Sequence, residues 1–287
     1  MQKRGVLQLL AGAVLFGLIP LFTTIGAEVG IITLLSGRSL FSLFFLGSVL
    51  VVKKENPFLP KKDRFKVFFW SMLLTSAMVC YFISLELIDM SVSGSLLGVQ
   101  PAFIALLAIL FLKEKVKIKT WVSCLICLVG IAFISGLQDV GNNNNVLGIV
   151  LALGAALFLA FNFIYHKKNL TKFDSLLLVF YQSIYQMIVF IPLLFFREFN
   201  MTLNGIIASA GLGILCTGLA YDLLYNGSKK VNAQYVGIFQ TIENIIPVLL
   251  GVFIFNESPD LSVYLGISLI VMSCIIVVVK APKVKIN

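Results

Sequence analysis

The chain has 287 residues, of which 59% are hydrophobic and only 12% are charged. Soluble domains average about 45–50% apolar and about 25% charged residues, so this chain has too few polar groups to cover a water-exposed surface. The composition excludes a water-soluble enzyme, a disordered chain and a disulfide scaffold, and it leaves a polytopic membrane protein.

Long apolar segments follow one another along the whole chain. A transmembrane helix needs about 20 largely apolar residues, and in chain order the sequence offers 5–25, 30–52, 65–87, 91–112, 118–137, 146–166, 174–196, 203–228, 233–255 and 261–280. The segments are continuous rather than short and alternating, which favours helices over barrel strands. We therefore predict an all-α integral membrane protein with ten transmembrane helices.

The basic residues indicate the orientation of these segments. If the N-terminus is cytoplasmic and each segment crosses once, 20 of the 22 Lys and Arg residues fall on the cytoplasmic side, as the positive-inside rule requires. The outer side instead holds Glu28, Glu86, Asp89, Asp139, Glu198, Glu257 and Asp260. Both termini are predicted to be cytoplasmic, and the net charge of +9 then reflects topology and predicts no nucleic-acid partner.

Several chemistries are not supported by the sequence. Cys124 and Cys127 form a C-x-x-C pattern inside an apolar segment, where buried structural thiols are favoured over a redox pair. The single histidine, His166, stands beside Lys167 and Lys168 and is expected in a solvated interfacial position. No phosphate-binding motif for ATP occurs, and we predict neither a metal site nor a cofactor.

Two stretches of the chain repeat each other. The sequence QPAFIALLAILFLKE (Gln100–Glu114) matches ENIIPVLLGVFIFNE (Glu243–Glu257), and GAVLFGLIPLF from Gly12 matches GAALFLAFNFI from Gly154. The predicted organisation is a first five-helix repeat over 1–137, a polar outer linker over 138–145, a second repeat over 146–280 and a cytoplasmic tail over 281–287. Because five is odd, the second repeat is inverted, an architecture found in many secondary transporters.

At this point the sequence resembles the drug/metabolite transporter superfamily, in particular its EamA-like members. The resemblance rests on the two five-helix repeats, on Pro101 followed by Glu114 at the end of a fourth helix, on Arg38 in the second helix and on Glu243 in the ninth. One departure is Asn244, which stands where a proline is usual. The resemblance implies export or exchange of small metabolites by alternating access, with the fifth and tenth helices at the periphery.

A second departure concerns the residue before each terminal glutamate. Lys113 and Asn256 stand where glycine is often found. The departures leave the superfamily assignment in place and make the substrate harder to infer.

Glu243 is the ionisable residue with the most informative context. Gln240, Glu243, Asn244 and Pro247 follow helical spacing and share one face of an otherwise apolar segment. Ionisable residues in membrane helices usually face the bundle interior and are functional. We expect this face to line a wet cavity in which Glu243 either carries a proton or binds a substrate amine, the alternative being a packing hydrogen bond.

Two further groups contain charge. Arg38 is predicted either to bind a substrate carboxylate through its planar guanidinium or to pair with a buried acid and hold the two halves together. Tyr221, Asp222 and Tyr225 lie close in sequence; they form either a site for an organic cation or part of an interfacial aromatic belt.

Neutral polar side chains complete the predicted cavity. Gln182, Tyr185 and Gln186 share a face of the seventh segment, and Gln100 precedes the proline of the fourth. Each offers hydrogen bonds without a charge, so each is a candidate for substrate contact.

Together these features predict a secondary transporter in a bacterial inner membrane that moves small metabolites, with amino acids or their derivatives first, as an exporter coupled to protons. Organic cations, drugs and nucleoside-like metabolites are the alternative cargo. A non-transporting scaffold or sensor and an intramembrane enzyme are the alternatives of another class. The expected partners are a small-molecule substrate, lipid and protons, and the protein is expected to be a monomer or a homodimer.

Overall fold

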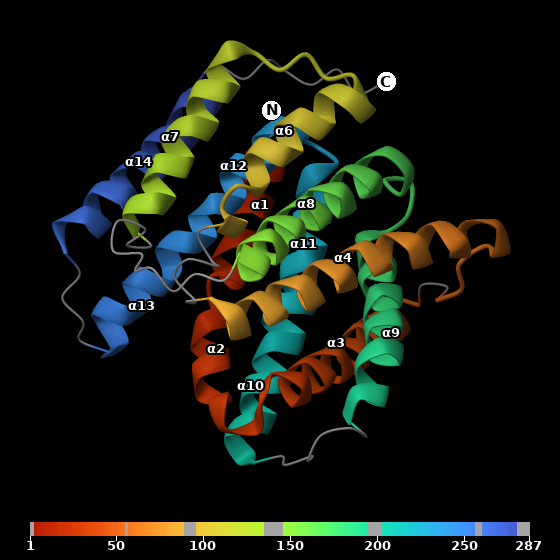
Figure 1. Cartoon of the computed structure of the whole chain (residues 1–287). Helices are drawn as coiled ribbons and strands as arrows, with labels where there is room; N and C mark the ends of the chain where they lie inside the picture. The colour runs from red at the N-terminus through yellow and green to blue at the C-terminus, as the bar shows by residue number, and fades with distance from the viewer. Residues whose placement is uncertain are drawn as a thin grey trace.

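The computed structural model describes residues 3–54, 57–88, 96–134, 146–194, 202–255 and 260–279, and within these ranges regular structure is helical, without a strand. The predicted linker 138–145 and tail 281–287 lie outside them. The helices run in the order α1 (Lys3–Phe16), α2 (Ile19–Ile25), η1 (Ala27–Val29), α3 (Ile31–Val52), α4 (Lys61–Leu87), α6 (Gln100–Leu112), α7 (Ile118–Ile134), α8 (Val146–Asn169), α9 (Ser175–Leu194), α10 (Leu203–Gly213), η3 (Ile214–Leu219), α11 (Ala220–Ser228), α12 (Ala233–Gln240), η4 (Thr241–Asn244), α13 (Ile245–Phe255) and α14 (Leu261–Val279) (Figure 1).

The described helices fall where the sequence places apolar segments. Stretches long and apolar enough to cross a membrane are Lys3–Ile25, Ile31–Val52, Val146–Asn169, Ser175–Pro192 and Leu203–Ser228. Shorter apolar helices cover Gln100–Leu112, Ile118–Phe133 and Leu261–Ile276. The all-helical fold class is confirmed, whereas the number of crossings and their orientation stay predictions.

Three of the predicted segments are interrupted helices rather than the continuous ones we expected. The first breaks at Gly17 between α1 and α2, and Pro20 opens the second piece. The eighth contains the π-helical turn η3, and the ninth contains the 3₁₀ turn η4. Pro247 has no N–H to donate to the carbonyl of Glu243, which explains the break at η4.

The long uninterrupted helices pack as antiparallel pairs. Asn162 of α8 donates from Nδ2 to the carbonyl of Trp70 in α4 at 2.8 Å. The hydroxyls of Ser42 in α3 and Ser183 in α9 share a hydrogen bond of 2.9 Å. Small polar side chains of this kind hold helices together where lipid provides no hydrophobic drive.

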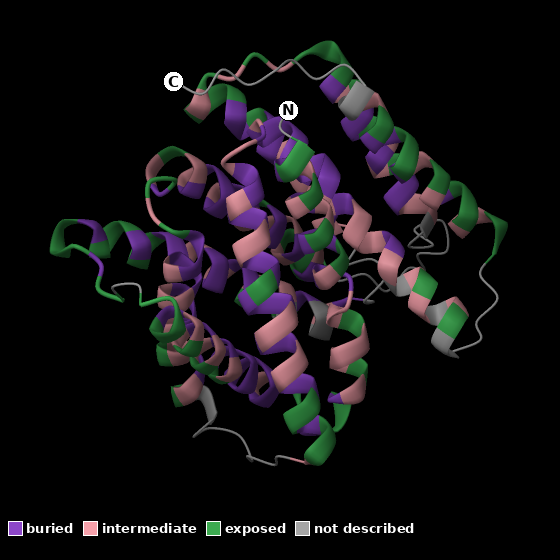
Figure 2. Ribbon diagram, turned by 180° about the vertical axis from the view of Figure 1, so that it is seen from behind, coloured by how far each residue is buried: buried purple, intermediate pink, exposed green. Residues whose placement is uncertain are grey.

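Helices α7 and α14 form a separate pair at one edge of the molecule (Figure 1). Ser123 of α7 donates to the carbonyl of Ser273 in α14 at 2.6 Å. Figure 2 shows exposed residues along the outer faces of the bundle and buried residues towards its centre. Cys124 and Cys127 of α7 are both buried free thiols.

Candidate functional site

The helix interruptions meet in the interior of the bundle. A Cβ atom on Gly17 would lie 2.8 Å from the carbonyl oxygen of Glu243 and 2.4 Å from Cβ of Ile246, so the break in the first segment packs directly on η4 and α13. A Cβ atom on Gly213, where α10 gives way to η3, would lie 2.6 Å from the carbonyl oxygen of Arg38. Only glycine allows these close approaches. They place the break of the first segment against η4 and the start of η3 against α3.

Arg38 projects from the uninterrupted helix α3 and is only 6% exposed. Its Nε donates to Oγ1 of Thr217 at 2.5 Å, and its side chain lies within hydrogen-bonding reach of the Tyr221 hydroxyl. Thr217 in turn donates to the carbonyl of Leu212 across the π turn at 2.8 Å. A guanidinium has several N–H donors, more than these two hydroxyls accept, so Arg38 keeps the capacity to bind an anion.

Glu243 stands in the 3₁₀ turn η4 and is half-buried. Tyr221 of α11 lies within electrostatic range of both Glu243 and Arg38, and Tyr81 of α4 lies within range of Glu243. Within the described ranges, the ion pairs closer than 4 Å involve Asp63 and Glu114, so Glu243 and Arg38 are not directly paired. Both charges instead lie near the same tyrosine.

The neighbours of Glu243 add aromatic and amide groups. The ring of Phe16 packs edge-to-face on Tyr221, with 4.8 Å between centroids. Asn244 donates from Nδ2 to the carbonyl of Thr241 at 3.1 Å, and Oε1 of Gln240 is buried without a hydrogen-bond partner among the described residues. A cation, a carboxylate, an aromatic face and amide groups within one cluster complement a small molecule that carries both charges.

Gln100 lies at the start of α6 and is half-buried. The next residue, Pro101, touches helix α12 so closely that a Cβ on Gly237 would lie 3.0 Å from Pro101 Cα. Gly237 precedes Gln240 by about one turn. The structure therefore brings the start of α6 next to the helix that leads into η4.

Asp222 lies on a different face of α11 from Tyr221 and Tyr225. Asp222 accepts a hydrogen bond from Nδ2 of Asn226 at 2.9 Å, and Asn226 in turn accepts from the hydroxyl of Ser175 at 3.1 Å. The ring of Tyr225 stacks on Tyr221, with 5.7 Å between centroids. The two tyrosines are thus together, while the carboxylate between them in sequence is directed towards the start of α9.

The three candidates of α9 have different surroundings. Gln182 is fully buried, and neither of its amide atoms has a hydrogen-bond partner among the described residues. Gln186 donates to the sulfur of Met78 at 3.4 Å. Tyr185 packs edge-to-face on Phe68 of α4, with 5.2 Å between centroids. The side chain of Phe68 is itself 39% exposed. Tyr185 therefore lies nearer the outer surface than Gln182 does.

His166 is a correction to the sequence analysis. It is fully buried rather than solvated, and its ring lies 4.3 Å from that of Tyr225 and 6.0 Å from that of Trp70. Tyr225 donates to Oδ1 of Asn162 at 3.1 Å and thereby closes the cluster. The signal was present, because Asn162 and His166 are one helical turn apart on the face of α8 that is rich in small residues.

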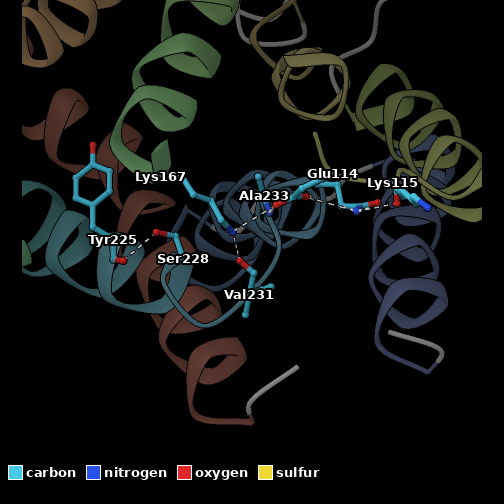
Figure 3. A network of polar contacts seen from close by, with 8 residues as sticks. Glu114, Lys115, Lys167, Tyr225, Ser228, Val231 and Ala233 are labelled. Atoms are coloured by element: carbon cyan, nitrogen blue, oxygen red, sulfur yellow. Dashed lines mark hydrogen bonds and ion pairs between the residues drawn. The ribbon is translucent and has the colours of Figure 1, made fainter. Parts of the chain in front are cut away.

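Glu114 joins the ends of α6 and α8 to the start of α12 (Figure 3). Its carboxylate accepts from the backbone N–H of Ala233 at 3.1 Å, and Lys167 lies 3.9 Å away. Lys167 also donates to the carbonyl of Val231. Because the N–H groups of a helix start lack intrahelical partners, Glu114 caps α12, a role that its place in the repeat did not reveal.

Asp63 lies at the same end of the bundle, before the apolar stretch 65–87. Its carboxylate contacts Nζ of Lys172 at 2.9 Å and Nζ of Lys66 at 3.2 Å. The hydrogen bond and charge of Lys172, aided by Lys66, hold the pKa of Asp63 below its usual value against the opposing effect of burial. This pair ties the start of α4 to the segment between α8 and α9.

An all-helical membrane bundle with charged side chains gathered at helix interruptions defines a class of multi-pass proteins that handle polar solutes. The EamA-like transporter family matches this chain over residues 3–136 and again over 146–279. The chain therefore belongs to the EamA-like transporter family, as the resemblance in its sequence indicated, and it is a multi-pass membrane protein.

Individual relatives agree with this membership. The chain is 25% identical over 276 residues to the uncharacterized transporter YxxF of Bacillus subtilis. The matched region covers 94% of this chain and 88% of that protein. It is 28% identical over 188 residues to an S-adenosylmethionine uptake transporter of Rickettsia bellii, covering 64% of this chain and 62% of that protein. These relatives are named as transporters and not as enzymes.

A solved crystal structure shares the fold. It superposes with a TM-score of 0.87 over 97% of this chain and 98% of its own, at 15% sequence identity. At this identity the likeness concerns the fold alone.

Proposed function

We propose that this protein is a secondary transporter that works by alternating access, with ten crossings arranged as two inverted five-helix repeats and both termini in the cytoplasm. The family matches the chain twice, over 3–136 and 146–279, which supports a division into two similar halves. The basic residues gather on one predicted side, which supports the orientation. Two similar halves of opposite orientation can exchange conformations and open a central site to each side in turn.

The proposed cargo is a small zwitterionic metabolite, an amino acid or a derivative of one. The observation that carries this proposal is that Tyr221 lies near both Arg38 and Glu243. In the proposed complex the guanidinium of Arg38 meets the substrate carboxylate, because its planar donors match a carboxylate. Glu243 meets the substrate amine, and the rings of Phe16 and Tyr221 contact the side chain.

Organic cations and nucleoside-like molecules are the second candidate cargo. The specific observation in their favour is the relative named as an S-adenosylmethionine uptake transporter. S-adenosylmethionine is itself an amino-acid derivative that carries a positive charge and a nucleoside, and a cation of this kind would be attracted to the faces of Phe16 and Tyr221.

We further propose export driven by inward proton flow, with Glu243 as the group that alternates between proton and substrate. Glu243 is half-buried at a break in the helix and lacks a close cationic partner in the described part of the chain. A carboxylate in this setting can exchange one positive charge for another, which is the requirement for coupling.

The test is flux in proteoliposomes loaded with labelled amino acids and, in parallel, with labelled S-adenosylmethionine. Efflux and uptake are measured with and without a proton gradient for the wild type, Glu243→Gln and the matched control Asp260→Asn, whose carboxylate is exposed. We expect gradient-dependent efflux that Glu243→Gln loses and Asp260→Asn keeps. Flux that ignores the gradient in both directions would exclude proton coupling.

A scaffold or sensor would keep the face around Glu243 dry. Cysteine is therefore placed at Gln240 and at Asn244 in a variant without the native thiols, and water-soluble thiol reagents are applied with and without substrate. We expect labelling that substrate slows. Complete resistance at both positions would favour the non-transporting class.

A further inference from the structure

A groove with a volume of about 260 Å³ lies on the outside of the bundle between α4, α6 and α8. Its apolar lining includes Phe69 and Leu73 of α4, Phe111 of α6, and Phe161 and Tyr165 of α8. The rings of Phe69 and Tyr165 lie 5.3 Å apart, and those of Phe111 and Phe161 lie 5.9 Å apart. Because Phe69 is 44% and Phe111 is 43% exposed, the groove opens to the surroundings rather than to the central cluster.

A lysine stands at one end of this apolar groove. Lys168 is exposed, and its Nζ lies 5.7 Å from the centroid of the Phe111 ring. In the part of the chain that the structure describes, Lys168 has neither an ion pair nor a hydrogen bond. The preceding Lys167 is directed inwards to Glu114 and Val231, so the two consecutive lysines serve different surfaces.

The groove runs from the basic end of the bundle towards its middle. Phe161 and Lys168 are separated by about 10 Å along α8. The start of α4 with Lys61 and Lys62 lies at the same end, because Asp63 contacts Lys172 just beyond α8. In a multi-pass membrane protein an outward-facing surface of this kind meets lipid, with acyl chains along the apolar part and headgroups at the charged end.

From this arrangement we propose that the groove binds one anionic phospholipid, with an acyl chain between Phe69 and Phe111 and the phosphate at Lys168. An apolar channel that ends in a cation is complementary to an amphiphile that ends in an anion, and basic pockets between membrane helices favour anionic headgroups. Since α4 and α6 belong to the first half of the chain and α8 to the second, the lipid bridges the two halves. This site is separate from Arg38 and Glu243, and the proposal does not depend on the transported substrate.

The test counts bound lipid by native mass spectrometry on the whole delipidated protein, titrated with phosphatidylglycerol or phosphatidylcholine. We expect one phosphatidylglycerol to bind more tightly than phosphatidylcholine. Lys168→Gln should weaken phosphatidylglycerol binding about fivefold, the value of one lysine near an anionic headgroup. The matched control Lys53→Gln, an exposed lysine at the end of α3, should leave the affinity unchanged.

A second variant tests the apolar part of the groove independently. Leu73→Trp fills the channel and should weaken the binding of phosphatidylglycerol while Lys168 is kept. Thermal unfolding in phosphatidylcholine alone verifies that each variant is folded. Equal retention of both lipids would overturn the proposal, and so would an equal effect of Lys53→Gln and Lys168→Gln. Full competition by soluble glycerol phosphate would also overturn it, because it would reveal an anion site without a lipid site.

Discussion

The uninterrupted and the interrupted helices of this protein contribute differently to its candidate site. Helices α3, α4, α8 and α9 run without a break and pack in pairs through small polar side chains. The segments α1–α2, α10–η3–α11 and α12–η4–α13 each change their helical geometry within the bundle. The cluster around Tyr221 lies where these two kinds of helix meet.

The comparison shows how charge is accommodated inside an apolar bundle. Arg38 is supplied by the interior of a regular helix, where backbone N–H and C=O groups pair with each other. Thr217 and Glu243 are supplied by irregular turns, where backbone carbonyls and N–H groups are less completely paired. A rigid helix thus positions the cation, while the turns provide polar neighbours and room for rearrangement, as in other transporters with broken helices.

The largest effect should come from adding one methyl group at an interruption. Gly17→Ala places a Cβ 2.4 Å from Cβ of Ile246 and 2.8 Å from the carbonyl of Glu243, and it should lower the free energy of unfolding in detergent by about 3 kcal/mol. The same change at Gly154 of α8, where nothing lies within 4 Å, should be neutral or stabilising by up to about 1 kcal/mol. Equal effects at the two positions would contradict the contrast between the two kinds of helix.

Removing the hydroxyl that accepts from Arg38 should have the next largest effect. Thr217→Val leaves Nε of the buried Arg38 without its acceptor, so we expect a loss of about 2 kcal/mol in unfolding free energy and weaker transport of carboxylate substrates. Thr24→Val is the matched control, because Thr24 also donates to a backbone carbonyl in its own helix but is exposed. If Thr24→Val lost as much stability as Thr217→Val, the contact of Thr217 with Arg38 would be unimportant.

A smaller effect is expected where two regular helices meet. Ser183→Ala removes the partner of the Ser42 hydroxyl and should cost about 1 kcal/mol. The double variant with Ser42→Ala should be less destabilised than the sum of the single variants, because no unpaired hydroxyl remains. Thermal unfolding of the wild type, both single variants and the double variant measures this coupling, and strict additivity would exclude it.

The smallest effect is expected at acid pH, at the charged end of the regular helices. The pKa of Asp63 is lowered in the folded protein by Lys172 and Lys66, so its stabilising contribution is present above the unfolded value of about 3.9. That contribution is lost as the pH falls through the lower folded value. Asp63→Asn should therefore lose less stability than the wild type as the pH falls below about 4, as measured by thermal unfolding. An equal loss in the variant and the wild type would show that Asp63 does not have this role.

Much of the fold could be predicted from the sequence, because apolar length and charge asymmetry act locally. The positions of the helices along the chain followed from these features, while the family was indicated by the resemblance of the repeats and motifs. Arg38 and Glu243 stood out because ionisable residues are costly in lipid. The direction of Asp222 and the capping of α12 by Glu114 could not be predicted, since each depends on which neighbouring helix faces that side chain.

The amino-acid sequence by itself determined that this protein is a helical membrane protein, because composition and apolar length are properties of each segment alone. Its repeats and motifs also carried the resemblance to the EamA-like family. Only the tertiary structure decided that Arg38, Tyr221 and Glu243 share one cluster and that Asp222 does not. These residues are far apart in the chain, and their approach depends on glycines that let helix breaks pack against one another. Close packing between distant segments is a property of the assembled bundle, and no single segment encodes it.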